Sequence, residues 1–323
     1  MKVSICIPTY KQVEFLRVAL CSVQEQDFPD YEVIISDDSP DDSVFQLLSE
    51  FSFGDKLRYV HNSSALGSPQ NWNAAIKMAQ GDYIKILHHD DHFVGSNALS
   101  QFVSLLDDNM EADFGFCATL VHHVDSGLER LHRTSAKQLE DLANDPASLF
   151  VGNCIGAPSA TICRRQANLE YDVRMKWLVD IDYYFRMLML NGKFAFTPQP
   201  LITTPTNAIH QVTELCRDDA KVELHEALLM FSRFSANQRE NPLVKQGWGN
   251  LFRRFRIRRI NQFSHYGIQP PEDATYFLPL LKWSHTGWRL IFQPKLLLKK
   301  ILYRIYPHIP RFIRTHLKKT FSR

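Results

Sequence analysis

The chain has 323 residues, of which 45% are hydrophobic and 22% are charged, and it contains 13 Gly and 16 Pro. This composition excludes small disulfide scaffolds and low-complexity chains, and it allows a sizeable hydrophobic core. The formal net charge of +2 hides an asymmetry, because residues 1–244 carry 20 Lys and Arg against 33 Asp and Glu, whereas residues 245–323 carry 17 against 2. We therefore expect an acidic body and a basic tail suited to an anionic surface.

Runs rich in β-branched residues alternate with helical patterns from the start of the chain. Strands buried on both faces are predicted over residues 3–7, 33–35 and 84–87. A helix is predicted from apolar residues at three- and four-residue steps, namely Val13, Leu16, Leu20 and Val23. A second helix is predicted over residues 69–80, with Pro69 near its start and Gly81 after its end. This order predicts a wound α/β sheet, mostly parallel, with flanking helices.

The second half of the chain has weaker patterns. We expect loops and a short helix over residues 122–155, where periodicity is poor. A helix is predicted over residues 179–190, ending at Gly192, and a strand over residues 193–197. From about residue 213 the pattern is mostly helical, with breaks expected at Pro242, Pro270, Pro271, Pro279 and Pro294.

Polar side chains follow the predicted strands, where ligands of open α/β sheets gather. The first strand is followed by Pro8, Thr9 and Tyr10, the second by Asp37 and Asp38, and the run at 84–87 by His88, His89, Asp90 and Asp91. Such carboxylates repel one another unless a cation lies between them, and oxygen ligands suit Mg²⁺ or Mn²⁺. We therefore predict a metal site in which the ion keeps coordination positions for a nucleotide diphosphate. For Asp41 and Asp42 we predict a different role, the capping of the helix that follows the strand.

Five segments, in order over residues 2–215, resemble family 2 glycosyltransferases with the GT-A fold. They are VSICIPTYKQVEFLRVALCSVQEQDF, YEVIISDDSPDD, NSSALGSPQNWNAAIKMAQGDYIKILHHDD, GNCIGAPSATICRR and WLVDIDYYFRML. The resemblance implies a GT-A domain over residues 1–240, and residues 241–323 are expected to form a helical basic extension. It also implies a metal-dependent, inverting transferase. This enzyme would move a sugar from a nucleotide-sugar donor to a saccharide or lipid-linked saccharide in bacterial surface polysaccharide synthesis.

The same resemblance implies roles on the donor side. It places Pro8, Thr9 and Tyr10 in the nucleobase pocket, gives Asp38 a hydrogen bond to the base, and makes Asp90 the last acid of the metal motif. His88 stands where that motif has its first acid, which the family uses for the ribose or the metal. An imidazole there can donate a hydrogen bond or bind the metal, and Asp91 becomes the second oxygen ligand.

On the acceptor side, Asp180 aligns with the general base of the family, six residues before Arg186, and Asp182 is a rival. A positioned carboxylate removes the proton of the attacking hydroxyl, while the metal stabilises charge on the departing diphosphate. The alternative for Asp180 is an exposed acid in a first helical turn. Further candidate contacts to the acceptor or diphosphate are Ser159, Asp182, Arg186 and His210.

Two other functions remain open at this point. A histidine-rich group with acids is typical of zinc hydrolases, and the chain has His88, His89, His92, His122 and His123. Adjacent histidines on an extended segment point to opposite sides, which disfavours a shared ion. Because His88 replaces an acid, a catalytically inactive module that binds a sugar nucleotide or a membrane is the second alternative.

Residues 295–306 combine an apolar face with a basic one, and more basic residues follow. This pattern predicts an interfacial helix on an anionic membrane, the alternative being an ordinary helix packed on the body. No nucleic-acid-binding module accompanies the charge, so we expect no nucleic acid partner. Without a leader pattern or an apolar run of about 18 residues, we expect a cytoplasmic protein on the inner face of the cytoplasmic membrane.

Overall fold

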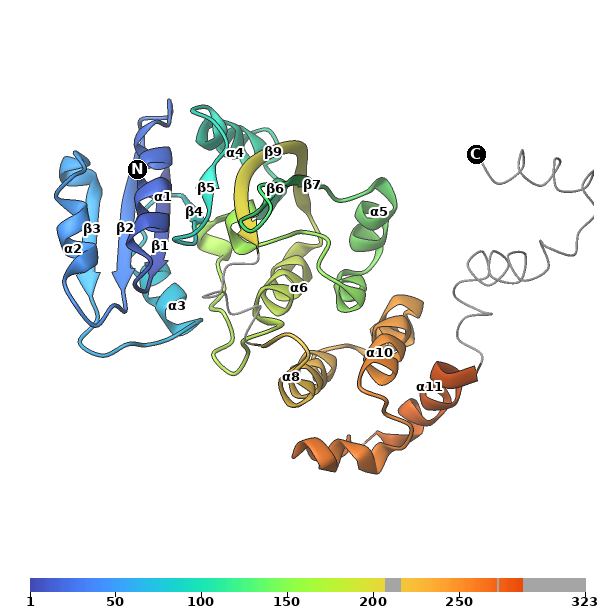
Figure 1. Ribbon diagram of the computed structural model, residues 1–323. Helices are drawn as coiled ribbons and strands as arrows, with labels where there is room; N and C mark the ends of the chain where they lie inside the picture. Colours follow the sequence, from blue (N-terminus) through green and yellow to red (C-terminus); the bar gives the residue numbers. More distant parts are fainter. Residues whose placement is uncertain (207–215, 272, 287–323) are drawn as a thin grey trace, which may run out of the picture. The chain divides into compact units, whose positions relative to one another are not determined.

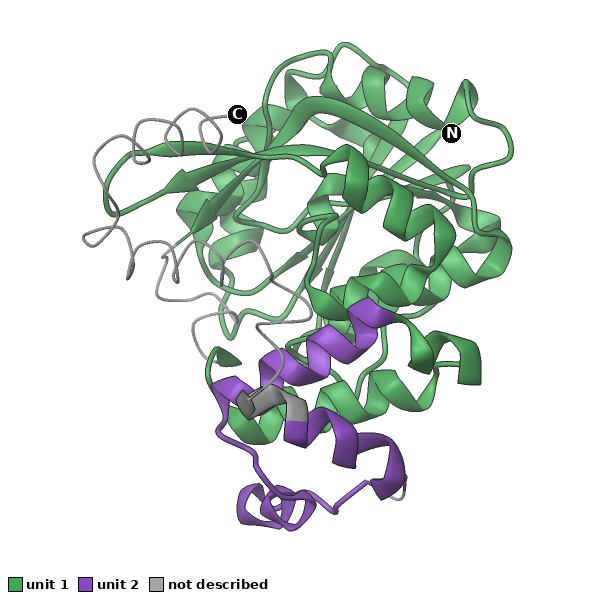
Figure 2. Cartoon of the chain, turned by 90° about the vertical axis from the view of Figure 1, so that its right-hand side faces the viewer, with its two compact units in different colours: residues 1–241 green, residues 242–323 purple. Residues whose placement is uncertain are grey.

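The computed structural model describes residues 1–206, 216–271 and 273–286. The chain divides into two compact units, residues 1–241 and 242–323 (Figure 2). The first unit contains the sheet and the predicted site residues. His210 and the predicted amphipathic helix over residues 295–306 lie outside the described residues.

Within the described residues, nine strands form one sheet in the order β3-β2-β1-β4-β8-β6-β9-β5, with β7 paired to β6 (Figure 1). The strands are β1 Val3–Thr9, β2 Tyr31–Asp37, β3 Leu57–His61, β4 Tyr83–Ile86, β5 His92–Phe93, β6 Phe114–His123, β7 Glu129–His132, β8 Thr161–Arg164 and β9 Phe194–Thr206. The N-terminal half is parallel, since β1 pairs with β2 and β4 and β2 pairs with β3. This half of the sheet agrees with the sequence prediction.

Helices cover both faces of the parallel half, and every residue of β1, β2 and β4 is buried as a result. On one face the core is built with α1 Val13–Gln24, α2 Ser43–Leu48 and α4 Ala98–Asp107. The other face is covered by α3 Gln70–Lys77 at β1 and, further along the sheet, by α6 Val179–Asn191 at β6. There the Cys6 thiol contacts the Ala75 carbonyl, and the ring of Tyr184 lies 5.5 Å from that of Phe114.

The second half of the sheet is mixed rather than parallel. Strand β8 is antiparallel to β4 and β6, β5 is antiparallel to β9, and β9 is parallel to β6. The expectation of loops over residues 122–155 is wrong at its start, because β6 continues to His123 and turns back antiparallel as β7. The side chains of β7 are mostly exposed and polar, so this edge strand has no apolar alternation to reveal it. The expected short helix is α5 Ala136–Asn144, followed by the 3₁₀ segment η2 Pro146–Val151.

Strand β9 is much longer than predicted, because the prediction stopped at its prolines. Cys117 of β6 pairs with Thr197, and the next residue, Ala118, pairs with Pro200. Two residues of β9 are skipped at this step, and a third, Leu201, is skipped before Ile202 pairs with Thr119. In such an irregularity of the ladder a missing proline N–H is tolerated. A helix break was also expected at Pro279, but this residue lies inside the helix α11 Ala274–Thr286.

Two glycines end predicted helices for different reasons. Gly192 follows α6 with a φ of 70°, the left-handed conformation expected of a helix end. Gly81, by contrast, stands four residues after the end of α3. A Cβ there would lie 2.7 Å from the backbone nitrogen of Ser4, so a close approach to β1 requires the glycine.

The remaining elements are helical. The first unit contains the 3₁₀ segments η1 Gly54–Lys56, η3 Pro158–Ala160 and η4 Arg165–Ala167, and helices α8 Ala220–Ser232 and α9 Ala236–Glu240. The second unit contains α10 Pro242–Arg254, η5 Ile260–Tyr266 and α11 Ala274–Thr286. In this unit the Trp248 ring contacts Phe252 and Phe277, with centroids 5.6 and 4.9 Å away. Among the described helices, none combines the length and apolar character that crossing a bilayer requires.

Glu226 of α8 holds the start of α6. Its carboxylate is buried and accepts hydrogen bonds from the backbone N–H groups of Lys176, Trp177 and Leu178, at 2.8 to 2.9 Å. Leu178 is the N-cap residue of α6 and the other two residues directly precede it, so the carboxylate lies at the helix N-terminus, where the helix dipole favours negative charge. This contact therefore fixes the first turn of α6, which carries Asp180.

We expect the Glu226→Ala variant to lower the free energy of unfolding by about 2 kcal/mol, because three N–H groups lose their acceptor. Urea denaturation followed by circular dichroism measures this change. The matched control is Glu111→Ala, since that side chain is 85% exposed and its loss should change stability by less than about 0.5 kcal/mol. Equal stability of the two variants would contradict the assignment.

Candidate functional site

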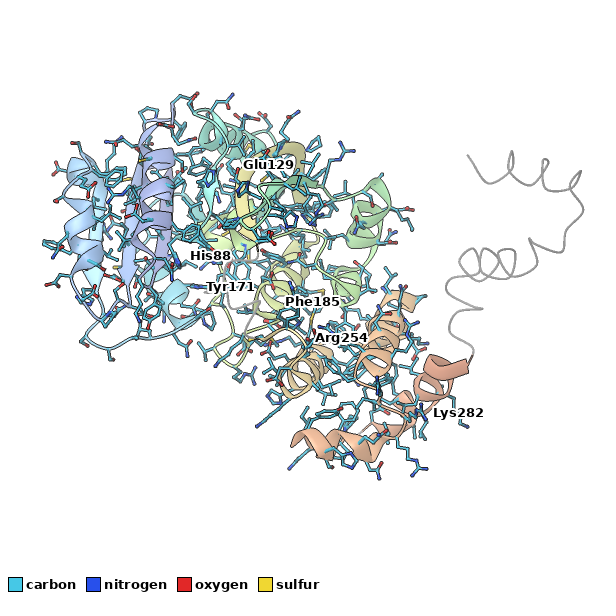
Figure 3. The ribbon with its side chains drawn as sticks, viewed as in Figure 1. His88, Glu129, Tyr171, Phe185, Arg254 and Lys282 are labelled. Atoms are coloured by element: carbon cyan, nitrogen blue, oxygen red, sulfur yellow. The ribbon has the colours of Figure 1, made fainter. Side chains whose placement is uncertain are left out.

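The segments that follow β1, β2 and β4 share one edge of the sheet, because these strands are adjacent and parallel. The His88 ring, which comes just after β4, lies against Trp72 of α3 with ring centroids 4.5 Å apart. Trp72 in turn contacts Tyr171 at 5.1 Å. Figure 3 shows His88 and Tyr171 in the middle of the first unit. The fold thus brings the segment after β4 beside the chain that precedes α6.

His88, Asp90 and Asp91 form a compact group of potential metal ligands. One ligand atom from each of the three lies within 4.8 Å of the other two. The turn is tight, since the Asp91 N–H donates to the His88 carbonyl at 3.0 Å. Nε2 of His88 and Oδ1 of Asp91 are shielded from solvent, and neither has a hydrogen-bond partner among the described residues. Buried polar atoms are normally paired, so this group fits a bound cation.

The electrostatics of the group favour the same conclusion. Burial, with the negative charge of Asp90, raises the pKa of Asp91 to about 8, and the hydroxyl of Ser159 counteracts part of this increase. Burial also lowers the pKa of His88 to about 4, so its imidazole is neutral at pH 7. A neutral imidazole has a lone pair for a metal. A cation between the two carboxyl groups would remove their repulsion.

Lys85 lies behind this group on β4, and its side chain is fully buried. Its ammonium group donates to the carbonyls of Ile86 and Ser159 and lies over the ring of Phe102, 4.6 Å from the centroid. Burial lowers the pKa of Lys85 to about 7. Sequence reasoning missed this residue, although a lysine inside the apolar run YIKIL was an available signal.

Asp180 stands at the second position of α6, and its carboxyl group is half-buried. Oδ2 accepts a hydrogen bond from the Asn153 amide at 2.7 Å, and Oδ1 accepts from the Ile181 N–H at 2.8 Å. Burial raises the pKa of Asp180 to about 6, and these hydrogen bonds oppose a larger increase. Such a carboxyl group is ionised at pH 7 and close to the pKa that suits a general base.

One turn, residues 153–160, holds Asp180 and the metal-ligand group at its two ends. At one end Asn153 bonds both Asp180 and the carbonyl of Gly156. At the other end the hydroxyl of Ser159 accepts from the His88 N–H at 2.9 Å, and its carbonyl accepts from Lys85. The predicted base and the predicted metal ligands are therefore supported by a common piece of backbone.

Three predicted acceptor or diphosphate contacts have structural partners instead. Asp182 is fully buried between two guanidinium groups, with Nε of Arg186 at 2.7 Å and Nε of Arg233 at 2.6 Å. This position makes Asp182 unsuitable as a base and uses Arg186 in a buried ion pair. Ser159 is also fully buried and supports His88 from behind. His210 lies outside the described residues.

On the predicted nucleotide side, Tyr10 is 47% exposed, whereas Pro8 and Thr9 are buried in the end of β1. Of these three side chains, only that of Tyr10 is open to a ligand. The backbone turns sharply after it, because Lys11 and Gln12 have φ values of 57° and 49°. The Thr9 carbonyl accepts from the N–H of Asp38, which ties the ends of β1 and β2 together.

The carboxylate of Asp38 is buried and holds the segment before α3. It accepts from the Asn62 amide at 2.8 Å and from the N–H groups of Leu66 and Gly67 at 3.0 and 2.8 Å. A carboxylate has about four acceptor positions, so three are used. Asp37, its neighbour, accepts from Ser39 and Tyr59 and is structural. Asn62 was not predicted as a functional residue.

The predicted zinc group is separated in the structure. His122 faces Glu129 at 3.8 Å, and His123 contacts the hydroxyl of Thr206 at 3.1 Å. Within the described part of the chain, the potential metal-ligand group contains His88 but neither of these residues. The acids beside His88 are thus the partners that matter for metal binding.

Comparisons with known proteins identify the family and the fold of this chain. Residues 4–172 match the sequence model of the family described as Glycosyl transferase family 2. An uncharacterized protein of Mycobacterium tuberculosis is 28% identical over 228 residues, covering 66% of this chain and 70% of that protein. The GalNAc(5)-diNAcBac-PP-undecaprenol beta-1,3-glucosyltransferase of Campylobacter jejuni is 33% identical over 120 residues, covering 36% of this chain and only 38% of that enzyme.

Two solved structures share the fold at low sequence identity. Residues 1–349 of Staphylococcus aureus TarS, in complex with UDP-GlcNAc, superpose with a TM-score of 0.65 at 15% identity, covering 88% of this chain and 87% of that chain. A mannosyltransferase of Pyrobaculum calidifontis, in complex with GDP-Man and Mn²⁺, has a TM-score of 0.55 at 14% identity, covering 97% and 82%.

The depressed pKa of Lys85 predicts a pH-dependent stability. Between about pH 7 and the ordinary Lys value of 10.5, the unfolded chain binds more protons at this residue than the folded chain. The free energy of unfolding of the wild type should therefore rise with pH in this window, relative to Lys85→Met, by roughly 4 kcal/mol from pH 7 to pH 10. Denaturation at several pH values measures the difference. Lys77→Met, at a 64% exposed side chain, is the control that should show none.

Proposed function

Because the chain belongs to glycosyl transferase family 2 and has the GT-A fold, we propose that it transfers a sugar from a nucleotide-sugar donor to a hydroxyl group of a saccharide or lipid-linked saccharide, with inversion and with Mg²⁺ or Mn²⁺. The observation that carries this proposal is the turn over residues 153–160. It holds a carboxyl group with a raised pKa at one end and the metal-ligand group at the other. Family membership disfavours the zinc hydrolase.

The donor side uses the ends of β1 and β2. The exposed ring of Tyr10 can stack on a nucleobase. Asp38 accepts three hydrogen bonds from described residues, and a further acceptor position on its carboxylate suits a base N–H. The structural neighbours were crystallised with UDP-GlcNAc and GDP-Man, which are both nucleoside diphosphate sugars. We assign the same chemical class of donor to this chain.

The diphosphate lies next to the metal-ligand group in this proposal. His88, Asp90 and Asp91 would hold the divalent ion. When bound, such an ion neutralises charge that develops on the departing diphosphate. Ser159 keeps the His88 backbone in place, and Lys85 anchors Ser159 in turn, so the ligands are positioned before substrate binds.

Asp180 is the proposed general base. Its carboxylate removes the proton of the acceptor hydroxyl as the oxygen attacks the anomeric carbon. The new carbon–oxygen bond forms while the bond to the diphosphate oxygen breaks, and the electron pair leaves with the diphosphate. Asn153 keeps Oδ2 oriented, and Glu226 keeps the first turn of α6 in place. Displacement from the opposite face inverts the anomeric centre.

The proposed setting is surface polysaccharide assembly at the inner face of the cytoplasmic membrane. Relatives in sequence include the GalNAc(5)-diNAcBac-PP-undecaprenol beta-1,3-glucosyltransferase of Campylobacter jejuni and a poly(ribitol-phosphate) beta-glucosyltransferase of Bacillus spizizenii. Both names describe acceptors attached to a lipid or a polymer. The basic sequence from residue 295 onward supports contact with an anionic membrane, where each Lys or Arg near the surface contributes about 1 kcal/mol.

The Asp180→Asn variant tests the chemistry. A panel of nucleotide sugars with Mn²⁺ and mass spectrometry first identifies the donor from its slow hydrolysis. We then expect Asp180→Asn to lower kcat at least about 100-fold, since the base is lost, while nucleoside diphosphate binding is unchanged. In the wild type, kcat/KM for the acceptor should fall with decreasing pH below about 6. Full activity of Asp180→Asn would refute the assignment, and Asp55→Asn, at an exposed residue, is the control.

The membrane proposal is tested on the tail. A chain lacking residues 294–323 should lose sedimentation with phosphatidylglycerol vesicles, because it loses the predicted apolar face and its surrounding basic residues. Vesicles of phosphatidylcholine alone serve as the uncharged control. Sedimentation that does not change on deletion would place the membrane contact elsewhere or remove it from the proposal.

A further inference from the structure

The metal-ligand group of this chain contains one nitrogen ligand. His88 contributes a ring nitrogen, and Asp90 and Asp91 contribute carboxylate oxygens, all within 4.8 Å. A metal-bound imidazole nitrogen is a neutral ligand, whereas a carboxylate in its place would bring a negative charge. The electrostatic attraction of this group for a divalent ion is therefore weaker than that of an all-carboxylate group. Its affinity for a given ion depends more on how strongly that ion binds a nitrogen ligand.

Two potential ligand atoms of the group make no hydrogen bond to the described residues. Nε2 of His88 and Oδ1 of Asp91 are shielded from solvent, and the described residues provide a hydrogen-bond partner to neither. Although both atoms belong to one compact group of potential ligands, they do not bond each other. A buried imidazole nitrogen and a buried carboxylate oxygen both left unpaired would be costly. A cation shared between them satisfies both atoms at once.

The His88 ring is also held in a defined place. The backbone N–H of His88 donates to the Ser159 hydroxyl at 2.9 Å, and the His88 carbonyl accepts from the Asp91 N–H at 3.0 Å. The ring packs against that of Trp72, with centroids 4.5 Å apart and the two planes tilted by 42°. A ligand held by such contacts loses little freedom when it binds a metal. These contacts distinguish His88 from a histidine that only fills space.

We propose that His88 binds the metal directly through a ring nitrogen and makes the site selective for first-row transition ions over Mg²⁺. This inference rests on the proposed metal-dependent transfer and specifies its ion. Imidazole is a good ligand for the series from Mn²⁺ to Zn²⁺, whereas Mg²⁺ prefers oxygen. Affinity should therefore increase from Mn²⁺ to Co²⁺ and be weakest for Mg²⁺.

The full-length chain is titrated with Mn²⁺, Co²⁺ and Mg²⁺ by calorimetry, without substrate. We expect the ratio of the Mg²⁺ and Co²⁺ dissociation constants to fall at least about tenfold in His88→Asp, where an oxygen ligand replaces the nitrogen. His225→Gln, at an exposed histidine, should leave the ratio unchanged. Electron spin echo spectroscopy of the Mn²⁺-loaded wild type, with ¹⁵N-labelled histidine, should show a coupled nitrogen that His88→Asp lacks. The wild-type spectrum alone tests whether a histidine nitrogen binds the metal, so this part of the test does not require a folded variant. Thermal melts show whether each variant is folded.

The outcomes separate the inference from the function it rests on. Tight Mn²⁺ binding and donor turnover, with no coupled nitrogen and an unchanged ratio in His88→Asp, would refute the role of His88 and leave the transferase proposal standing. Wild type that binds none of the three ions would overturn both the inference and the proposed metal dependence. A coupled nitrogen together with the altered ratio would support the inference.

Discussion

The bonds made by one turn of the chain, residues 153–160, connect the two halves of the site. Lys85 and His88 both donate to Ser159 near the end of this turn. Near its start, Asn153 donates to Asp180. Donor and acceptor chemistry must be aligned within a fraction of an ångström, and backbone hydrogen bonds to buried groups are suited to that task. A rearrangement of this turn would move the base and the metal ligands relative to each other.

Burial acts on three groups of the candidate site with different results. Asp180 receives hydrogen bonds from Asn153 and from backbone, which limits its pKa to about 6. Asp91 stands beside Asp90, so its pKa rises further, to about 8. His88 becomes neutral for the same reason, since burial disfavours any charged form. Burial with different partners thus yields a carboxylate suited to accept a proton and a group suited to hold a cation.

Much of the fold follows from local pattern. The parallel strands β1, β2 and β4 and the helix over 179–190 were predicted, because continuous apolar runs and helical periodicity express burial directly. The polar edge strand β7 and the proline-containing strand β9 were missed, since their partners and an irregular ladder hold them in the sheet. Likewise, the sequence around Asp180 and Asp182 does not show which of the two acids forms an ion pair. The structure shows that Asp182 does, because Arg233, 51 residues further along the chain, contacts its carboxylate.

The sequence alone determined the family resemblance, the acids after the strands and the replacement of an acid by His88. All of these are residue identities at fixed spacing. Tertiary structure alone revealed Lys85 behind the metal-ligand group, Glu226 at the start of α6 and the shared turn. The physical reason is that burial and hydrogen-bond partners arise between segments distant in the chain. The chemical character of a carboxyl group depends on those neighbours more than on its own position.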